Sequence, residues 1–409
     1  MKKVNRVEQQ IIKRNNPIYK IVDQYCFYSK NVYNQANYII RQEFINNNNK
    51  LSAYDVQKLM QSIDCYKECG SQAAQKTIQL VDKMWKSYFK AIKDWKKNPS
   101  KYLGMPKLPK YLPKDGRQVF MLKNIQCSLN NGQFRIAFKP FGGYTVKTHA
   151  VGKLMQCRFV PKADYYVMEI VYEIEVLETE NIVSERIAAI DLGVDNLMTI
   201  TTNCDVSPII INGKPLKSIN QYYNKKISEM RSALKLRNDS DWSNEMQRFT
   251  TKRNNQVDDY IQKSTKMVVN FCKCNDIDTL VCGYNSGWKQ DTNMGKRVNQ
   301  KFVSIPYLSI VQRLEYKCEN EGIKFIKTNE SYTSGTSFLD GEEPIEKNYN
   351  KDRRIYRGLF QSEKGVYINA DVNGSYQIMK KVFPKAFANG IVDAGSHPVV
   401  VNIPLQTVK

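Results

Sequence analysis

Histidine is nearly absent from this chain, which carries only His149 and His397 among its 409 residues. Catalysis or metal binding that depends on several histidines is therefore nearly excluded, and an enzyme of this composition would have to work with carboxylates. No CxxC pair occurs, and the ten cysteines are scattered rather than spaced as a disulfide framework or a four-cysteine zinc site. We expect reduced cysteines in a cytoplasmic protein.

Long apolar runs are missing too, because none approaches the roughly 18 residues that a membrane span needs. The N-terminal MKKVNRVEQQIIKRNNP is charged but lacks the apolar core of a signal peptide, so we expect neither secretion nor a membrane partner. What the chain has in excess is positive charge, with 62 Lys and Arg against 40 Asp and Glu, and 42% of its residues are hydrophobic. A folded and strongly basic chain is typical of a protein that binds a polyanion.

A basic ribbon follows the first hundred residues. Residues 101–150 contain nine lysines and arginines against a single acid. Within them, GMPKLPKYLPKDGR carries three prolines, which hold the backbone extended and prevent a helix. We predict that this ribbon tracks a nucleic-acid backbone, the alternative being a solvated linker. The candidate contact residues are Lys101, Lys107, Lys110, Tyr111, Lys114 and Arg117.

The spacing of apolar residues indicates a mixed α/β protein. Between about 21 and 92 they recur every three or four positions, which is typical of helices, and Ser52 with Asp55 has the pattern of a capping box. From about 119 to 175 they alternate as in strands. The pattern predicts a β module interrupted by helices and followed by an α/β domain.

The segment RIAAIDLGVDNLMTITTN predicts a strand that delivers Asp191 at its end and continues into a hairpin. This is the first step of an RNase H-like fold, in which an acid at the carboxyl edge of the sheet binds a divalent cation. A second acid usually ends the next buried strand, here DTLVC, but this chain has Gly283 at that point. The departure leaves one carboxylate of such a site unaccounted for.

Glu330 is a candidate for the missing acid, because it follows a further predicted strand, residues 324–328. Neighbouring strands lie about 4.8 Å apart, so a glutamate side chain from an adjacent strand would reach the place left empty at Gly283. The alternative is a surface acid that caps a turn. If the strands are adjacent, we expect Glu330 to turn inward.

Asp371 lies at the start of a helix predicted in INADVNGSYQIMKKVFP, where an aspartate can also be an ordinary N-cap. Together with Asp191 and Glu330, it would complete a group of three carboxylates, which repel one another unless cations neutralise them. We predict that Asp191, Glu330 and Asp371 are catalytic residues that bind two Mg²⁺ ions and hydrolyse phosphodiester bonds.

The sequence resembles TnpB (OrfB), the RNA-guided nucleases of bacterial insertion sequences, which are related to compact type V CRISPR effectors. The resemblance covers essentially the whole chain and is carried by GMPKLPKYLPKDG, IDLGVDNLMTI, GYNSGWKQ with NMGKRVNQKFVSIPY, ESYTSGTSF, and ADVNGSYQI with GSHPVVV. It implies a transposon-encoded, RNA-guided DNA endonuclease. Its partners would be an omega-type guide RNA from the transposon end and a target DNA beside a short adjacent motif, in the bacterial cytoplasm at the nucleoid.

The resemblance also implies a multi-domain α/β architecture. Residues 1–14 and 99–184 would form a β-barrel-like wedge domain, residues 15–98 a helical recognition lobe, and residues 185–409 an RNase H-like (RuvC) nuclease domain. Most members carry CxxC knuckles in an insert, at about 331–370 here, but this insert has no cysteine. We therefore expect no zinc. Packing is expected to hold the insert around Phe338, Tyr356 and Phe360.

Residue by residue, Asp191 and Asp371 match the first- and third-motif aspartates of the family, while Gly283 stands at the second-motif glutamate. A branch of the family with GYN- or GHN-type second motifs pairs that loss with the ESYTS glutamate, which is Glu330 here. We expect three further residues to lie near the site and to contact nucleic acid, namely Trp288, Lys289 and Gln290. Trp288 would stack on a base or, alternatively, simply pack in the fold.

Two other functions stay open. A nuclease-inactive, RNA-guided DNA-binding repressor is favoured by Gly283 and opposed by the three remaining carboxylates. A structure-selective nuclease that needs no RNA is distinguished by co-purification, because a guided protein should bring a discrete RNA with it.

Overall fold

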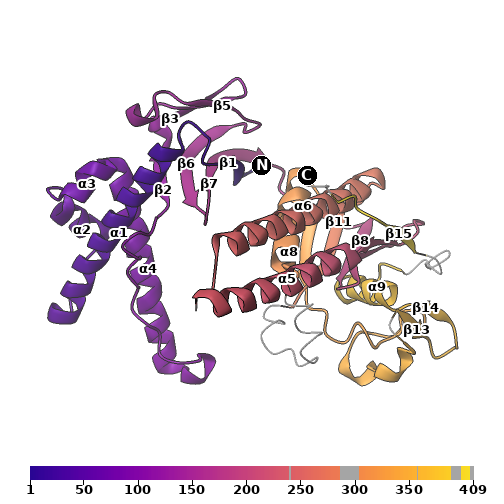
Figure 1. The fold of residues 1–409 in the computed structure, drawn as a ribbon. Coiled ribbons are helices and arrows are strands. Elements are labelled where there is room, and N and C mark those ends of the chain that lie inside the picture. The colour runs from indigo at the N-terminus through magenta and orange to yellow at the C-terminus, as the bar shows by residue number, and fades with distance from the viewer. Residues whose placement is uncertain (239–240, 286–303, 357, 388–397, 406–409) are drawn as a thin grey trace. The chain divides into compact units, whose positions relative to one another are not determined.

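The computed structural model describes residues 1–238, 241–285, 304–356, 358–387 and 398–405. The chain is a mixed α/β protein with two compact units (Figure 1). One unit is Lys3–Glu175, and the other is Val176–Lys409 together with Met1–Lys2. Among the described residues, no helix combines the length and the apolar character needed to cross a membrane.

The first unit combines a group of helices with two antiparallel sheets. The helices are α1 (Tyr19–Asn47), α2 (Ala53–Met60), α3 (Asp64–Cys69) and α4 (Ser71–Lys97). The larger sheet has the order β1-β7-β6-β2, from β1 (Lys2–Ile12), β7 (Tyr166–Val176), β6 (Lys153–Pro161) and β2 (Phe120–Lys123). The smaller sheet contains β3 (Cys127–Asn130), β4 (Gln133–Ile136) and β5 (Thr145–Lys147). Because β1 lies beside β7, the larger sheet combines a strand that precedes the four helices in the sequence with strands that follow them.

Local sequence signals begin some of these helices as expected. Ser52 precedes α2, and its hydroxyl accepts a hydrogen bond from the Asp55 amide while the Asp55 carboxylate accepts one from the Ser52 amide. This confirms the predicted capping box. In the core of the unit, the buried indole of Trp85 in α4 donates to Asn37 in α1 at 2.9 Å, so the packed pair of helices also satisfies its internal polar groups.

The second unit is organised around a six-stranded sheet with the order β12-β11-β8-β9-β10-β15. Its strands are β8 (Ile187–Leu192), β9 (Asn196–Thr202), β10 (Ile209–Asn212), β11 (Thr279–Gly283), β12 (Lys324–Thr328) and β15 (Val399–Val401). The first three form an antiparallel meander, whereas β11 runs parallel to β8 and β12 runs parallel to β11. The strand that ends at Gly283 and the strand that precedes Glu330 are therefore adjacent, which is the condition on which the expected inward turn of Glu330 depends.

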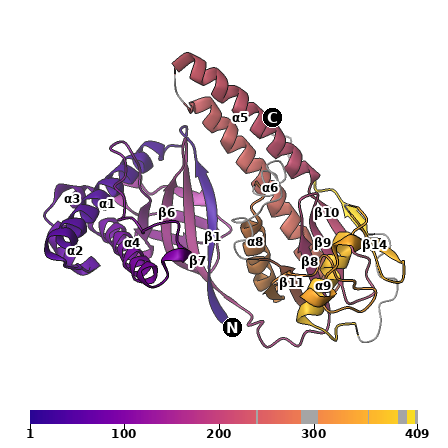
Figure 2. The same cartoon turned by 90° about the horizontal axis from the view of Figure 1, so that it is seen from below.

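Helices cover both faces of this sheet. They are α5 (Lys214–Asn238), α6 (Asn244–Cys274), α8 (Tyr307–Asn320) and α9 (Ala370–Val382), and Figure 2 shows α5 and α6 running side by side as a long pair. In β8, Ala188 and Ile190 belong to the core formed with α6 and α8, whereas Ile187 and Ala189 belong to the core formed with α9. Successive side chains of a strand point to opposite faces, so Asp191 emerges on the α9 face.

The insert at 331–370 is mostly irregular, with η4 (Glu346–Asn348), η5 (Lys351–Arg353), β13 (Leu359–Gln361) and β14 (Tyr367–Asn369). The expected packing is found for two of its three aromatic residues. Phe360 is buried, and Phe338 stacks on Tyr376 of α9 with ring centroids 4.5 Å apart. The expectation for Tyr356 is wrong, since its side chain is 63% exposed. It follows η5 at the surface, where its carbonyl accepts the Leu359 amide at 3.1 Å.

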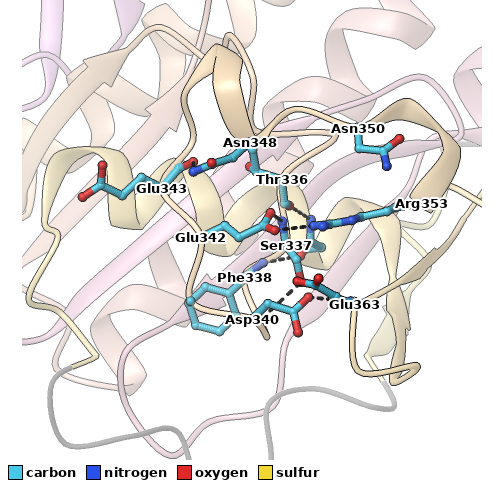
Figure 3. A network of polar contacts seen from close by, with 12 residues as sticks. Thr336, Ser337, Phe338, Asp340, Glu342, Glu343, Asn348, Asn350, Arg353 and Glu363 are labelled. Carbon is cyan, nitrogen blue, oxygen red and sulfur yellow. Dashed lines mark hydrogen bonds and ion pairs between the residues drawn. The ribbon is translucent and has the colours of Figure 1, made fainter.

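A network of polar contacts also holds the insert together (Figure 3). Arg353 donates to the Glu342 carboxylate at 2.6 Å, and the other oxygen of Glu342 accepts the Ser337 amide at 2.8 Å. Asp340 accepts the Glu363 amide at 2.7 Å, which ties the two halves of the insert together. These charge-assisted hydrogen bonds link segments that contain little regular secondary structure.

Candidate active site

Three acidic side chains from separate elements line one cavity of about 410 Å³. They are Asp191 from β8, Glu330 from the loop after β12 and Asp371 from the first turn of α9. The cavity lies at the carboxyl end of the parallel strands β8, β11 and β12, which is where open α/β sheets commonly bind ligands. The structure therefore brings together the three carboxylates that the sequence analysis singled out.

A close approach of α9 to β8 places Asp191 next to Asp371. Gly374 lies one turn after Asp371, and a Cβ atom at this glycine would lie only 3.0 Å from Asp191 Oδ2. A larger residue would push against the carboxylate. Gly374 therefore allows the buried end of β8 and the start of α9 to share the cavity.

Gly283 provides the corresponding space for Glu330. It ends β11 opposite Thr328 of β12, and a Cβ atom here would lie 3.2 Å from Glu330 Oε2 and 2.6 Å from Ile378 Cδ1. The Glu330 carboxylate thus reaches the position beside the end of β11 where the sequence has Gly283 in place of the expected acid. The alternative of an outward-facing surface acid is wrong, because Glu330 lines the cavity and its Oε2 atom is buried.

Hydrogen bonds fix the Glu330 segment. The Glu330 amide donates to Asn285 Oδ1 at 3.1 Å, and Asn285 Nδ2 donates to Glu330 Oε1 at 3.4 Å. On the other side, the Thr333 hydroxyl donates to the Glu330 carbonyl at 2.7 Å. Among the described residues, Glu330 Oε2 has no hydrogen-bond partner although it is buried. A buried carboxylate oxygen without a partner is costly, so this atom is suited to a cation.

Asp371 is not the cap of its helix. Asn369 is the N-cap, and its side-chain oxygen accepts hydrogen bonds from the amides of Asp371 and Val372. The Asp371 carboxylate is instead contacted by two polar side chains that the sequence analysis did not identify. Asn196 donates to Oδ2 at 2.7 Å, and Arg354 donates to Oδ1 at 3.1 Å.

The sequence carries only weak signals for these two additional residues. Asn196 begins β9 in the hairpin that follows Asp191, so its nearness to the site follows from the turn. Arg354 comes from the irregular insert, where the basic run KDRR is the only hint of a contact with an acid. Local periodicity gives no information about which way such a loop side chain points.

The electrostatics of the site reflect its concentration of negative charge. Burial and the nearby charges of Asp371 and Glu330 raise the pKa of Asp191 well above its usual range, and the charge of Arg354 opposes this. Burial raises the pKa of Glu330 to about 7, against the opposing charge of Lys381. Desolvation and like charges that shift carboxylates upward in this way are common in functional sites.

The donor chemistry of the cavity fits a hard divalent cation. Carboxylate oxygens are the ligands that Mg²⁺ prefers, and the partnerless Glu330 Oε2 and the buried Asp191 lack full charge compensation. As they stand, however, no three Asp, Glu, His or Cys side chains in the described ranges are grouped closely enough to hold one ion. Binding by all three carboxylates would therefore require them to move closer together.

The basic ribbon is described in the first unit and is clamped to α1 through its backbone. Three α1 side chains contact ribbon carbonyls: Lys30 donates to Lys114 at 2.7 Å, Tyr33 to Lys110 at 3.1 Å and Asn34 to Leu112 at 3.0 Å. Lys107, Lys110, Tyr111 and Lys114 have exposed side chains. A fixed backbone with outward lysines is a suitable arrangement for contacting phosphates.

Two ribbon candidates have protein partners. Arg117 pairs with Asp23 at 2.8 Å and is half-buried, so its guanidinium supports the fold of the unit. Lys101 pairs with Asp94 at 2.9 Å on the surface. The other predicted contacts, Trp288, Lys289 and Gln290, lie outside the described residues.

Two family models match parts of the chain. Residues 169–289 match OrfB_IS605, described as a probable transposase, and residues 307–378 match the Cas12f1-like TNB domain. The first match includes Asp191, and the second includes Glu330, Arg354 and Asp371. No curated protein matches the chain.

The solved structures that match the chain include a Cas12f1–sgRNA–target DNA complex, with 17% identity over 91% of this chain and 98% of that chain and a TM-score of 0.37. A CRISPR-Cas12f ternary complex has 15% identity over 88% of this chain and 80% of that chain, again with a TM-score of 0.37. The two family models, over residues 169–289 and 307–378, each match less than half of the chain.

Proposed function

We propose that this chain, a TnpB-like protein related to compact type V effectors, is a transposon-encoded RNA-guided DNA endonuclease. In this proposal residues 185–409 form an RNase H-like (RuvC) nuclease domain. Residues 1–14 and 99–184 are the wedge domain, and residues 15–98 are the recognition lobe. Guide RNA and a target DNA beside a short adjacent motif are the partners.

The observation that carries the proposal is the shared cavity of Asp191, Glu330 and Asp371. The sheet around it supports an RNase H-like domain, because an antiparallel meander, β8 to β10, is extended by the parallel strands β11 and β12. Glu330 arrives from one strand further out and lies beside Gly283, so the cavity retains three carboxylates despite the altered second motif.

The chemistry follows from the oxygen donors. Asp191, Glu330 and Asp371 would hold two Mg²⁺ ions, which when bound activate a water and stabilise the leaving oxygen at a scissile phosphate. Arg354 and Asn196, which contact Asp371, would then face a negatively charged substrate. Their donors suit phosphate oxygens as well as carboxylates.

Binding of nucleic acid in this proposal uses the basic ribbon. Lys107, Lys110 and Lys114 present exposed charges from a backbone that α1 holds in place. Each lysine that contacts a phosphate releases counterions, which favours binding at moderate salt. Lys101 and Arg117 contribute less, since each is paired with an aspartate.

A second candidate function is an RNA-guided DNA-binding repressor without nuclease activity. It is favoured by the engagement of Asp371 with Arg354 and Asn196 and by the separation of the three carboxylates. It leaves unexplained why Asp191 and Glu330 are both buried at this cavity, where the charges of Arg354 and Lys381 offset theirs only in part. Burying carboxylates near one another costs stability, so a purely structural role does not account for them.

The decisive experiment is cleavage of a plasmid that matches the co-purified RNA. Wild type should cut it, whereas Glu330→Gln, which keeps the side-chain shape and removes the charge, should bind the DNA normally and cut at least about 100-fold more slowly. The control is Glu346→Gln, which removes an exposed acid from the insert that follows Glu330. An inert wild type that binds DNA would support the repressor, and full activity of Glu330→Gln would remove Glu330 from the site.

A further inference from the structure

The ends of β11 and β12 stay paired beyond the two strands. Gly283 lies opposite Thr328 in the parallel register, and the Tyr284 amide still donates to the Thr328 carbonyl at 2.8 Å. Asn285 follows Tyr284 just beyond the end of β11 and therefore emerges beside Glu330. This local pairing places an amide side chain next to a carboxylate that comes from the neighbouring strand.

Asn285 contacts Glu330 at two points. Its Oδ1 atom accepts the Glu330 amide at 3.1 Å, and its Nδ2 atom donates to Glu330 Oε1 at 3.4 Å. The first contact holds the backbone, and the second directs the carboxylate. With Oε1 held in this way, the partnerless Oε2 atom lies toward the space beside Gly283.

Lys381 also acts on this segment, in addition to Thr333. It donates to the Ser331 carbonyl at 3.0 Å and so ties the loop to α9, but this contact is to the backbone and not to the carboxylate. Within the described part of the chain, Asn285 is the residue that donates a hydrogen bond to the Glu330 carboxylate. The orientation of the acid therefore depends on Asn285.

We propose that Asn285 is a positioning residue for Glu330, which orients the relocated carboxylate for binding a divalent cation. The inference rests on the proposed function, in which Glu330 is a metal ligand. A glutamate has three rotatable side-chain bonds, and ordering it costs conformational entropy at the moment of binding. A hydrogen bond from a neighbouring side chain that fixes the ligand beforehand reduces this cost.

The test measures Mn²⁺ binding by calorimetry on the full chain freed of nucleic acid, in a double-mutant cycle. Asn285→Ala should weaken Mn²⁺ binding about 10-fold. In a Glu330→Ala background, the same substitution should cause no further loss, because Asn285 acts through Glu330. A merely structural residue would weaken binding equally in both backgrounds. The matched control is Asn329→Ala, which removes a side-chain oxygen that accepts the Ser331 amide in the same loop.

Hydrogen–deuterium exchange gives a second readout that does not depend on metal or cleavage. The Glu330 amide should exchange faster in Asn285→Ala than in wild type, since its acceptor is lost. If Asn285→Ala does not fold, Asn285→Ser, whose hydroxyl is too short to reach Oε1, should give the same loss of Mn²⁺ affinity. Unchanged Mn²⁺ affinity in either folded variant, or equal losses with and without Glu330, would overturn the proposal.

The outcomes separate this inference from the proposed function. Coupled loss of Mn²⁺ affinity in a chain that never cleaves DNA would support the positioning role and reject the nuclease. Cleavage by wild type together with unaltered Mn²⁺ binding by Asn285→Ala would reject the positioning role alone. A wild-type chain that binds no Mn²⁺ would overturn both.

Discussion

The guanidinium group of Arg354 donates a hydrogen bond to the Asp371 carboxylate at 3.1 Å, from a loop seventeen residues upstream. This contact supplies a positive charge to a cavity whose lining includes the acids Asp191, Asp195, Glu330 and Asp371. A cation that binds Asp371 would compete with Arg354 for the same oxygen. The ion pair is therefore expected to weaken metal binding in the chain without nucleic acid.

The first prediction is that Arg354→Ala tightens Mn²⁺ binding about two- to fivefold, because a partly exposed ion pair contributes modestly. Arg354→Lys keeps the charge and should stay near wild type. Calorimetry on the full chain freed of nucleic acid provides the measurement. Weaker binding in Arg354→Ala would mean that Arg354 orients Asp371 rather than competing for it.

Much of the site follows from rules that act locally along the chain. Asp191 and Glu330 each follow a recognisable strand, and parallel strands bring their carboxyl ends to one edge of a sheet. The helix after Asn369 is signalled by its apolar spacing, and Pro384 marks its end. These features made the meeting of Asp191, Glu330 and Asp371 predictable before any coordinates.

The remaining features depend on tertiary contacts without a local pattern. Arg354 and Tyr356 are two positions apart in an irregular loop, yet one reaches the carboxylates and the other is exposed. Arg117 looks like every other basic residue of the ribbon, and only its contact with Asp23, 94 positions away, shows that it supports the fold. Long-range pairing of this kind cannot be inferred from spacing.

The second prediction concerns the space at Gly283. A Cβ atom there would lie 2.6 Å from Ile378 Cδ1 in a buried position, so Gly283→Ala should destabilise the protein by about 1–3 kcal/mol. Ile378→Val removes the Cδ1 atom and should cost about 1 kcal/mol alone. The double variant should be more stable than the sum of the two losses predicts, because the added methyl fills the space. Chemical denaturation of the four proteins measures this coupling, and strict additivity would contradict the crowding.

The third prediction is a pH dependence of stability that originates at Glu330. Its pKa is raised from 4.5 to about 7 by burial, so between these values the folded chain keeps a proton that the unfolded chain has lost. Stability must therefore fall as the pH rises through this window, and it levels off above about pH 7.

In EDTA, wild type should lose about 3 kcal/mol relative to Glu330→Gln between pH 4.5 and pH 7.5, since the glutamine never ionises. Denaturation of both proteins across this range measures the difference. Mg²⁺ added at pH 7.5 should restore part of the loss in wild type and little of it in the variant. Parallel pH profiles for the two proteins would show that Glu330 ionises as freely as an exposed glutamate.

The fourth prediction separates the ribbon lysines that face solvent from the one that is paired. Each lysine contact with a phosphate changes the slope of log affinity against log salt by roughly 0.7 to 0.9, so replacing Lys107, Lys110 and Lys114 with alanine should reduce the slope by about two to three units. Filter binding of the co-purified RNA at several salt concentrations measures this.

Lys101→Ala is the matched control and should change the slope by less than one unit, because Asp94 already neutralises that charge. If Lys101→Ala matched the effect of the three exposed lysines together, the clamped ribbon would not be the surface that follows the RNA backbone. The charge of the unit as a whole would then account for binding.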